Sequence, residues 1–336
     1  ILFYLFTSYS ITCFIIEFLI PLSHYIKLVA YPNHRKLHNN AIPLIGGISI
    51  FFTFLILSFV IDFIFFKNFY VILSLLIILL LGFLDDKYRL SVFYKLIFQF
   101  LASYILVFNV HFISSYDWSF LLLFNNLLIS KIFSVILIVL IVNAMNFIDG
   151  VDGLLLGIST IISLSFIFLL YYFSMVESID TLVIFSGCLL AAFSYNRFPA
   201  KIFLGDLGSM GIGWFFAIYS FYFANLTSYP HMIMFPLILL SFPMLDLFML
   251  IYIRFSTNNI TYAQKFLFIF KSDRKHIHHR LLNAYENHNK VVLVSSFYVI
   301  FCLIISIISW IIFGHFKFGV ITVLVSFLSI RCLLLK

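Results

Sequence analysis

Long apolar stretches alternate with short polar segments along the whole chain. A helix that crosses a bilayer needs about 20 apolar residues, with a range of about 17–25. The apolar runs are continuous and not alternating, so no strand pattern competes with helices. The predicted spans are 1–20, 44–66, 69–84, 92–113, 131–147, 153–173, 180–195, 208–225, 231–253, 291–313 and 316–335. The pattern therefore predicts an all-α polytopic membrane protein with about eleven spans, forming a single transmembrane domain over residues 1–336.

Some stretches fit this pattern less well. The stretches 69–84 and 180–195 are short and would need flanking residues to span. Residues 120–129 are too few to span and include Asn125 and Asn126, so we interpret them as an interfacial segment. Residues 1–20 have no basic start and no small-residue cleavage site, so we expect a span there and not a removable leader.

The composition excludes several classes of protein. Apolar residues make up 64% of the chain and charged residues 10%, with a mean hydropathy of +1.15. A soluble domain is roughly 45–50% apolar and about 25% charged, so a soluble enzyme, a disordered segment and a fibrous protein are excluded. The four cysteines stand singly in apolar stretches, which indicates neither a zinc site nor a disulfide framework.

The basic residues predict the orientation in the membrane. The net charge is +7, but next to membrane spans such residues set topology and meet anionic headgroups, so no nucleic acid partner is indicated. We number the loops between the predicted spans in chain order, so that loop 1 joins the first span to the second. Of the 20 Lys and Arg residues, only Lys67, Lys131 and Lys317 lie on even-numbered loops. This bias predicts a multi-pass protein of the inner (plasma) membrane, with the odd-numbered loops and the C-terminus in the cytoplasm.

Five polar clusters interrupt the apolar pattern, and all five lie on odd-numbered loops. In chain order they are YPNHRKLHNNAIPLIGG (31–47), LGFLDDKYRLS, NAMNFIDGVDGL, YNRFPAKIFLGDLGSMGIG and DRKHIHHRL. Polar groups at the ends of membrane spans are costly and indicate function. Their shared side of the membrane predicts one active site on the cytoplasmic face.

Acidic residues dominate three of these clusters. Asp85 and Asp86 are adjacent, so they repel one another unless a metal, a basic partner or a proton offsets them; a solvated helix end is the alternative. Asn146, Asp149 and Asp152 recur every three residues, but Gly150 and Gly153 favour a turn there. Helix capping explains one or two of these side chains and leaves the others without a structural role.

The acidic set is typical of a magnesium site. Asp206 lies among glycines, which let the backbone approach a ligand closely. Asp206, Asn146 and the Asp85–Asp86 pair would form an all-oxygen donor set, which suits Mg²⁺ or Mn²⁺ and not zinc. Mg²⁺ takes few carboxylates and completes its shell with substrate phosphates and waters, so the substrate is expected to carry phosphate.

The basic clusters have two interpretations. The groups are Arg35, Lys36 and His38 in the first cluster and His276, His278, His279 and Arg280 in the last. They could contact pyrophosphate oxygens, or they could be juxtamembrane headgroup anchors. Phe203 would ordinarily be core or lipid-facing, and only its position three residues before Asp206 suggests stacking on a base.

Together these motifs resemble the polyprenyl-phosphate N-acetylhexosamine-1-phosphate transferases, a family that includes MraY. The pieces PNHRKLHNNAIPLIGG, LGFLDDKYRLS, NAMNFIDGVDGL, FPAKIFLGDLGS and HIHHRL occur in family order over residues 32–282. The histidine motif and FPAKIFLGD are most similar to the WecA/TagO branch. The resemblance implies a Mg²⁺-dependent enzyme that transfers sugar-1-phosphate from a UDP-N-acetylhexosamine, with UDP-GlcNAc expected first, to undecaprenyl phosphate, and that releases UMP.

The resemblance also implies a role for individual residues. Asp206 would be a metal ligand with Asn146, and Asp85, beside Asp86, would be a base or would orient phosphate. Sequence leaves open whether attack is direct or passes through a covalent aspartyl-phosphate. The implied catalytic residues are Asp85, Asp86, Asp149, Asp206 and His278. The implied substrate-binding residues are Lys36, His38, Lys95, Asn146, Asp152, Asn196, Phe203, His279 and Arg280.

One departure and one rival function stay open. The stretch from Asp246 to His276 is longer than is usual in this branch, so the sugar that is transferred is the least certain part of the assignment. A transporter or flippase for an anionic solute would also need intramembrane charges, but here the acidic groups lie at span ends. The sequence does not distinguish a monomer from a homodimer, nor does it identify the polymer that is primed.

Overall fold

The computed structural model describes residues 1–31, 41–60, 68–116, 118, 126–176, 179–227, 230–256, 276–314 and 316–334. Helices make up most of this part of the chain because lipid offers backbone groups no hydrogen-bond partners. The first half contains α1 (Leu2–Tyr25), α2 (Gly46–Val60), α3 (Phe69–Tyr88), α4 (Val92–Asn109), α5 (His111–Ser114), α6 (Leu127–Phe147) and α7 (Leu154–Tyr172). The second half contains α8 (Ile179–Asn196), α9 (Gly205–Leu226), α10 (Met234–Leu239), α11 (Ser241–Ser256), α13 (Ile277–Tyr285), α14 (His288–Phe313) and α15 (Lys317–Leu334), with a short 3₁₀ helix, η4 (Pro230–Ile233).

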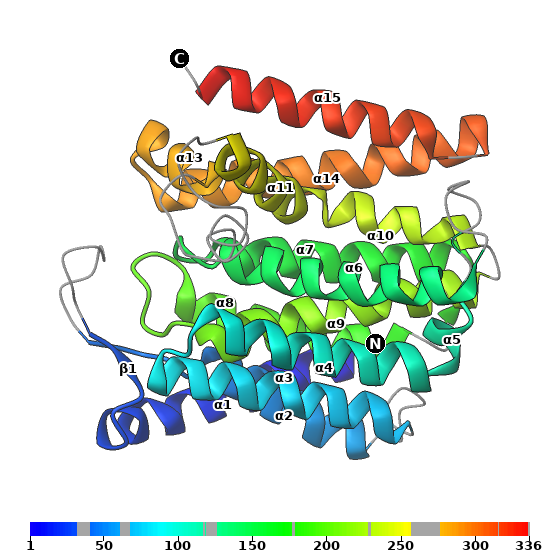
Figure 1. The fold of residues 1–336 in the computed structure, drawn as a ribbon. Helices are drawn as coiled ribbons and strands as arrows, with labels where there is room; N and C mark the ends of the chain where they lie inside the picture. Colours follow the sequence, from blue (N-terminus) through cyan, green and yellow to red (C-terminus); the bar gives the residue numbers. More distant parts are fainter. Residues whose placement is uncertain are drawn as a thin grey trace.

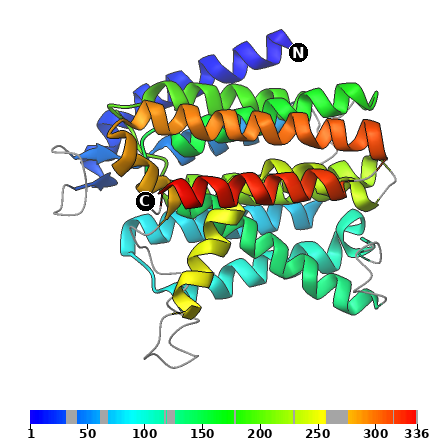
Figure 2. The same ribbon diagram turned by 90° about the horizontal axis from the view of Figure 1, so that it is seen from above.

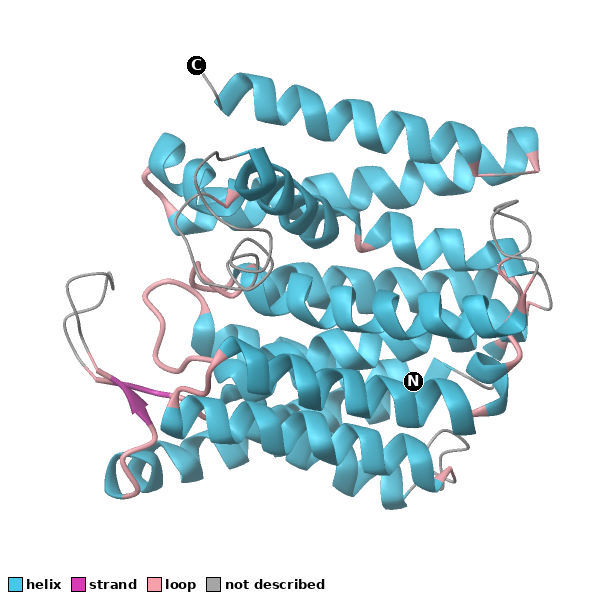
Figure 3. Cartoon of the chain, viewed as in Figure 1, coloured by secondary structure: helices cyan, strands magenta, loops and turns pink. Residues whose placement is uncertain are grey.

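The long helices lie side by side in one bundle (Figure 1). The N-terminus of α1 and the C-terminus of α15 lie at opposite ends of the bundle (Figure 2). The β-strands, α13 and most of the described irregular loops lie at the end of the bundle where the C-terminus of α15 lies (Figure 3). The described parts of the polar clusters are therefore at one end of the molecule, as the loop parity predicts.

Helix α9 is the centre of the bundle. Its most apolar 18-residue stretch is 94% buried, against 17% for α1, which lies at the edge. Glycines let α2 and α3 approach it closely: a Cβ added to Gly47 would lie 2.3 Å from the Cα of Gly208, and one on Gly82 would lie 2.3 Å from the Cα of Leu207. Such small-residue contacts are the usual way in which membrane helices pack tightly.

Each predicted span overlaps a helix or a helix pair of the described chain. Within the part of the chain that the structure describes, eight helices are long and apolar enough to cross a membrane, and a ninth would result from joining a bent pair. The remaining two stretches correspond to the shorter apolar helices Gly46–Val60 and Lys317–Leu328. A polytopic α-helical membrane protein is thus confirmed, whereas the count of eleven spans stays a prediction. Most of the 120–129 segment lies outside the described residues.

The predicted span 231–253 is broken in the structure. Residues His231–Leu239 and Ser241–Arg254 meet at an angle of 79°. Pro243 follows the break, and proline has no N–H to donate to the carbonyl four residues earlier. The bend directs α11 across the end of the bundle toward α13 (Figure 1).

A small β-ladder is present that the sequence pattern did not predict. Strands β1 (Val29–Ala30) and β2 (Ile42–Pro43) pair antiparallel, with Val29 opposite Pro43. The chain after β2 also binds the segment before α9, since Phe203 N donates to Pro43 O at 2.8 Å and Gly46 N to Phe203 O at 3.0 Å. These bonds hold the first polar cluster against the fourth.

Candidate active site

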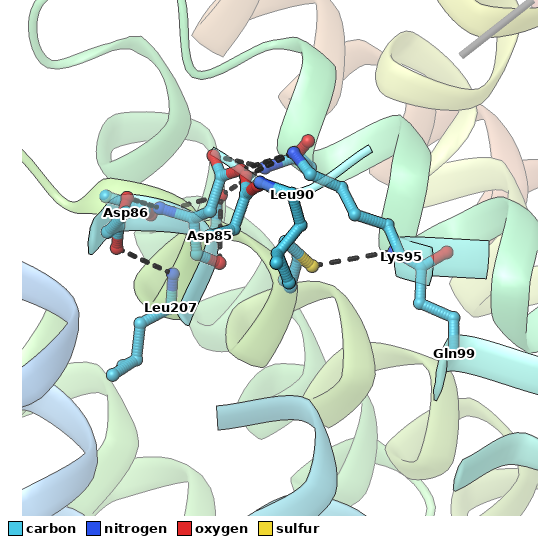
Figure 4. A network of polar contacts seen from close by, with 11 residues as sticks. Asp85, Asp86, Leu90, Lys95, Gln99 and Leu207 are labelled. Carbon is cyan, nitrogen blue, oxygen red and sulfur yellow. Dashed lines mark hydrogen bonds and ion pairs between the residues drawn. The ribbon is translucent and has the colours of Figure 1, made fainter. Parts of the chain in front are cut away.

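Asp206, Lys95 and Asp85 come from three different helices and meet at one end of the bundle. Asp206 lies in the first turn of α9, Lys95 in the first turn of α4 and Asp85 in the last turn of α3. The Lys95 Nζ donates to Asp206 Oδ2 at 2.8 Å and forms an ion pair with Asp85 Oδ2. One ammonium therefore bridges two carboxylates, and Figure 4 shows the Lys95 side chain extended toward Asp85.

Asp86 is held differently from its neighbour. The sequence pattern ends the predicted span at residue 84, but α3 continues to Tyr88 and carries both carboxylates in its last turn. Asp86 Oδ1 accepts from Asp206 N at 2.8 Å and Oδ2 from Leu207 N at 3.2 Å (Figure 4). A carboxylate on free helix N-terminal amides is stabilising. Asp86 thus fixes the start of α9, and with it the position of Asp206.

A polar network supports Asp206 from the membrane side. Asn146 Nδ2 donates to Asp206 Oδ1 at 3.1 Å and to Ser209 Oγ at 2.7 Å. One turn deeper, Asn143 Nδ2 donates to Gln99 Oε1 at 2.6 Å, although Gln99 is only 1% exposed. Buried polar groups that are hydrogen-bonded rigidify their surroundings. The network therefore fixes α4, α6 and α9 against one another directly below the carboxylates.

The site has more carboxylates than cations among the residues that the structure describes around Asp206. Asp85, Asp86 and Asp206 are close together, and Lys95 is the ammonium that contacts two of them. The carboxylates and the amide of Asn146 supply hard oxygen donors, which suit Mg²⁺. The residues present therefore fit a hard divalent cation at this position.

Asp149 and Asp152 lie in the turn between α6 and α7. The turn forms at Gly150–Gly153, as predicted from the glycines, and Gly153 has a φ of +77°. Burial raises the pKa of Asp149 to about 7, and the negative charges of Asp206 and Asp152 add to the shift. Asp152 Oδ2 accepts from Ala200 N at 3.3 Å, which joins this turn to the loop before α9. Asp149 therefore lies within electrostatic reach of the carboxylate cluster.

Two of the residues implied in nucleotide binding make structural contacts. The Asn196 side chain is buried, accepts from Gly153 N at 3.0 Å and donates to Ile202 O at 2.8 Å. The Phe203 side chain is half-buried, and its backbone makes the β-contacts described above. Asn196 thus positions the turn after α6, while a direct nucleotide contact for either residue stays a prediction.

The histidine motif lies against the Asp149–Asp152 turn. His278 is fully buried, and its ring is 4.4 Å from that of His279. A Cβ on Gly150 would lie 2.9 Å from His278 Nε2 and 3.1 Å from the His279 ring. Arg280 is on the same helix and half-buried. The last polar cluster thus joins the third at the same end of the bundle.

Lys36 and His38 lie outside the described residues, as does most of the long 254–275 segment. Two residues near the site have no predicted role in the motif pattern. They are Asp246, which binds His276 and His278, and Gln99, which lies below the carboxylates. A carboxylate or amide within an apolar run is costly in lipid, and this was the signal that could have found both.

A cavity of about 780 Å³ adjoins this end of the bundle. Arg197 and Lys201 line it on the loop before α9, and Asp152 and Gly153 line it on the turn after α6. Its other walls are mainly apolar residues of α7, α8 and α14, down to Ile161 and Ile300. At 1.5 Å per residue, the stretch from Asn289 to Ile300 is on the order of 16 Å long. The cavity thus combines a charged mouth with an apolar interior.

Comparison with known proteins places the chain that carries these residues in a family. The model of glycosyl transferase family 4 matches residues 68–224, which include Asp85, Lys95, Asn146 and Asp206. A Bacillus subtilis (strain 168) protein described as a probable undecaprenyl-phosphate N-acetylglucosaminyl 1-phosphate transferase is 30% identical over 289 residues, 80% of this chain and 74% of that protein. The chain belongs to glycosyl transferase family 4.

Two further relatives are transferases by name. A decaprenyl-phosphate N-acetylglucosaminephosphotransferase of Mycobacterium tuberculosis (strain CDC 1551 / Oshkosh) is 29% identical over 311 residues, 81% of this chain and 73% of that protein. A phospho-N-acetylmuramoyl-pentapeptide-transferase of Dictyoglomus thermophilum is 32% identical over 184 residues, 52% of this chain and 57% of that protein. These relatives are transferases by name and give the transporter alternative no support.

Proposed function

We propose that the protein transfers N-acetylhexosamine-1-phosphate, with GlcNAc as the sugar, from a UDP-sugar to undecaprenyl phosphate and releases UMP. The observation that carries the proposal is the meeting of Asp85, Lys95, Asn146 and Asp206 at one end of an apolar bundle. The names of the relatives support a polyprenyl phosphate acceptor and an N-acetylglucosamine phosphate donor. The product would prime a cell-surface polysaccharide.

The reaction joins two anions, so positioning and charge neutralisation are its main requirements. An oxygen of the lipid phosphate attacks the sugar-bearing phosphorus, and the bond from that phosphorus to the bridging oxygen breaks. UMP leaves with that oxygen and its electron pair. The second pKa of a phosphate monoester is near 6, so the acceptor is already mostly a dianion at neutral pH and needs no strong base.

Each residue of the cluster has a role in this scheme. Mg²⁺, held by Asp206 and the amide oxygen of Asn146, would neutralise charge on the pyrophosphate. Lys95 presents an ammonium beside the same carboxylates, and Asp86 keeps α9 in place through two backbone amides. Asp85 is fixed by Leu90 N at 2.7 Å and orients the attacking phosphate. A direct attack is favoured, because Asp85 already pairs with Lys95 and is a poor nucleophile in that state.

The cavity beside Asp152 suits the acceptor lipid. Arg197 and Lys201 at its mouth complement a phosphate, and its apolar walls run into the membrane layer. A polyprenyl phosphate could hold its chain along α14 with its head near the Asp149–Asp152 turn. The cytoplasmic UDP-sugar would then reach the same end from the water side.

The test is UMP release by the purified protein in lipid vesicles that contain undecaprenyl phosphate, with a panel of UDP-sugars and Mg²⁺. Release is expected with UDP-GlcNAc and should be lost when the divalent cation is chelated. Asp206→Asn should lower the rate by roughly 10²–10³-fold, the usual loss for one electrostatic group. Asp180→Asn, at the opposite end of the bundle in the first turn of α8, is the matched control. The absence of UMP with every sugar would contradict the proposal.

A further inference from the structure

Asp246 has three hydrogen-bond donors around one buried carboxylate. It lies on α11 and is 1% exposed. Its Oδ2 is 2.9 Å from His278 Nδ1 and 3.2 Å from His276 Nδ1, while its Oδ1 accepts from Ile277 N at 2.8 Å. Both imidazoles thus present Nδ1 to the same oxygen. This arrangement links α11 to the start of α13.

The bond to Asp246 leaves one atom of His278 available. With Nδ1–H held by the carboxylate, the other ring nitrogen, Nε2, faces away from Asp246. That Nε2 is buried and has no hydrogen-bond partner among the residues that the structure describes. It lies beside Gly150, where an added Cβ would be 2.9 Å away, in the turn that carries Asp149 and Asp152. A buried polar atom without a hydrogen-bond partner is costly, so its position against this turn indicates a ligand that completes it.

The same three side chains have the composition of a metal site, but their geometry favours hydrogen bonds. One ligand atom from each of Asp246, His276 and His278 lies within 4.8 Å of the others. Zinc bonds of 2.0–2.1 Å would place tetrahedral ligand atoms about 3.3 Å apart. The separations from Asp246 Oδ2, 2.9 and 3.2 Å, lie within the range of N–H···O bonds.

We propose that Asp246 is a positioning residue, which fixes the Nδ1–H tautomer of His278 and directs Nε2 at the sugar nucleotide bound against the Gly150 turn. The proposal rests on the transferase function proposed above. It assigns Asp246 a part in the reaction through His278, in the way that a buried carboxylate orients a functional imidazole in other sites. His276 shares the carboxylate, but its ring packs on Phe147 with centroids 5.3 Å apart.

The kinetic test is a double-mutant cycle measured as UMP release. Asp246→Asn and His278→Gln should each lower kcat by roughly 10–100-fold, the range found for partners of functional groups. The double variant should be no worse than the poorer single variant, because Asp246 acts through His278. His276→Gln is the matched comparison. When Asp246→Asn is added to the His276→Gln protein, kcat should still fall by most of the factor seen for Asp246→Asn alone. If the fold-losses in kcat of Asp246→Asn and His278→Gln multiplied in the double variant, the proposal would be overturned.

A second measurement does not depend on activity. In protein labelled with ¹⁵N-histidine, the His278 signals, assigned by their loss in His278→Gln, should report a protonated Nδ1. In Asp246→Asn that signature should disappear, while circular dichroism shows that the helices are retained. An unchanged Nδ1 signal, or stoichiometric zinc that is lost with Asp246→Asn, would overturn the proposal. A wild-type protein that released no UMP would contradict the transferase function, and the ¹⁵N signals would still decide the role of Asp246.

Discussion

The carboxylates at the end of the bundle differ in how each is held. Asp86 is bound by two backbone amides, which leaves it little freedom to act on a substrate. Asp85 and Asp206 share the ammonium of Lys95, and Asp206 also accepts from Asn146. The pKa of Asp149 is raised by burial and by the charges of Asp206 and Asp152, and no cation is among these causes. These surroundings, and not the residue type, distinguish Asp86, which anchors the start of α9, from the other acidic side chains.

The state of Asp149 should make stability depend on pH. Its pKa is raised from an ordinary 3.8 to about 7, so the folded protein keeps a proton that the unfolded chain releases. The free energy of unfolding should therefore fall as pH rises from about 4 to 7, by at most about 4 kcal/mol at 1.36 kcal/mol per pKa unit. Melting temperatures of the substrate-free protein between pH 5 and 8 measure this change.

Asp149→Asn should flatten that dependence, because the amide cannot lose a proton. The variant should melt at a higher temperature than the wild type at pH 8, and this difference should shrink as the pH is lowered to 5. Equal pH slopes for the wild-type protein and the variant would show that Asp149 is not the group responsible.

At the scale of elements, the close contact of α3 with α9 holds Asp86 on the start of α9. Gly82→Ala places a Cβ 2.3 Å from the Leu207 backbone, so the two helices must separate. We expect a loss of about 1–3 kcal/mol, the usual cost of overpacking, together with lower transferase activity. Gly319→Ala on α15 is the matched control, since its Cβ would meet ordinary contacts at 3.4 Å or more. Equal thermal stability of the two variants would contradict the packing argument.

A separate prediction concerns the cavity lined by α7, α8 and α14. Ser296→Trp would fill part of it. The KM for the polyprenyl phosphate should then rise roughly tenfold, which is about 1.4 kcal/mol, while the KM for the UDP-sugar stays near the wild-type value. Phe168→Trp, at a 48% exposed position of α7 away from the cavity, is the control. A rise in the KM for the UDP-sugar alone would place the acceptor elsewhere.

At the scale of the whole molecule, the orientation in the membrane can be measured. In a cysteine-free background, Lys201→Cys lies at the site end and Lys317→Cys at the start of α15, at the other end. A membrane-impermeant maleimide should label only Lys317→Cys in intact spheroplasts and should label Lys201→Cys after lysis. The opposite pattern would place the carboxylates outside the cytoplasm.

The sequence predicted the architecture because lipid imposes one pattern on every span. The apolar runs located the helices, and the parity of the polar clusters predicted that they gather at one end. It predicted less of the local geometry: α3 runs on through Asp85 and Asp86, and Asp86 binds amides of a helix 120 residues later in the chain. Asp246 was also missed as a partner of the histidine motif, because its link to His278 depends on the bend before α11. Such tertiary pairings leave no periodic trace in the chain.

The shared ammonium of Lys95 has a consequence for the cycle of turnover. If the proposed Mg²⁺ leaves between turnovers, the acidic side chains on α3 and α9 repel one another unless another cation offsets them. Lys95 pairs with both Asp85 and Asp206 and would offset part of that repulsion. The cation-free site therefore keeps part of its negative charge neutralised, which helps the helices that carry it to stay in place until the next substrate binds.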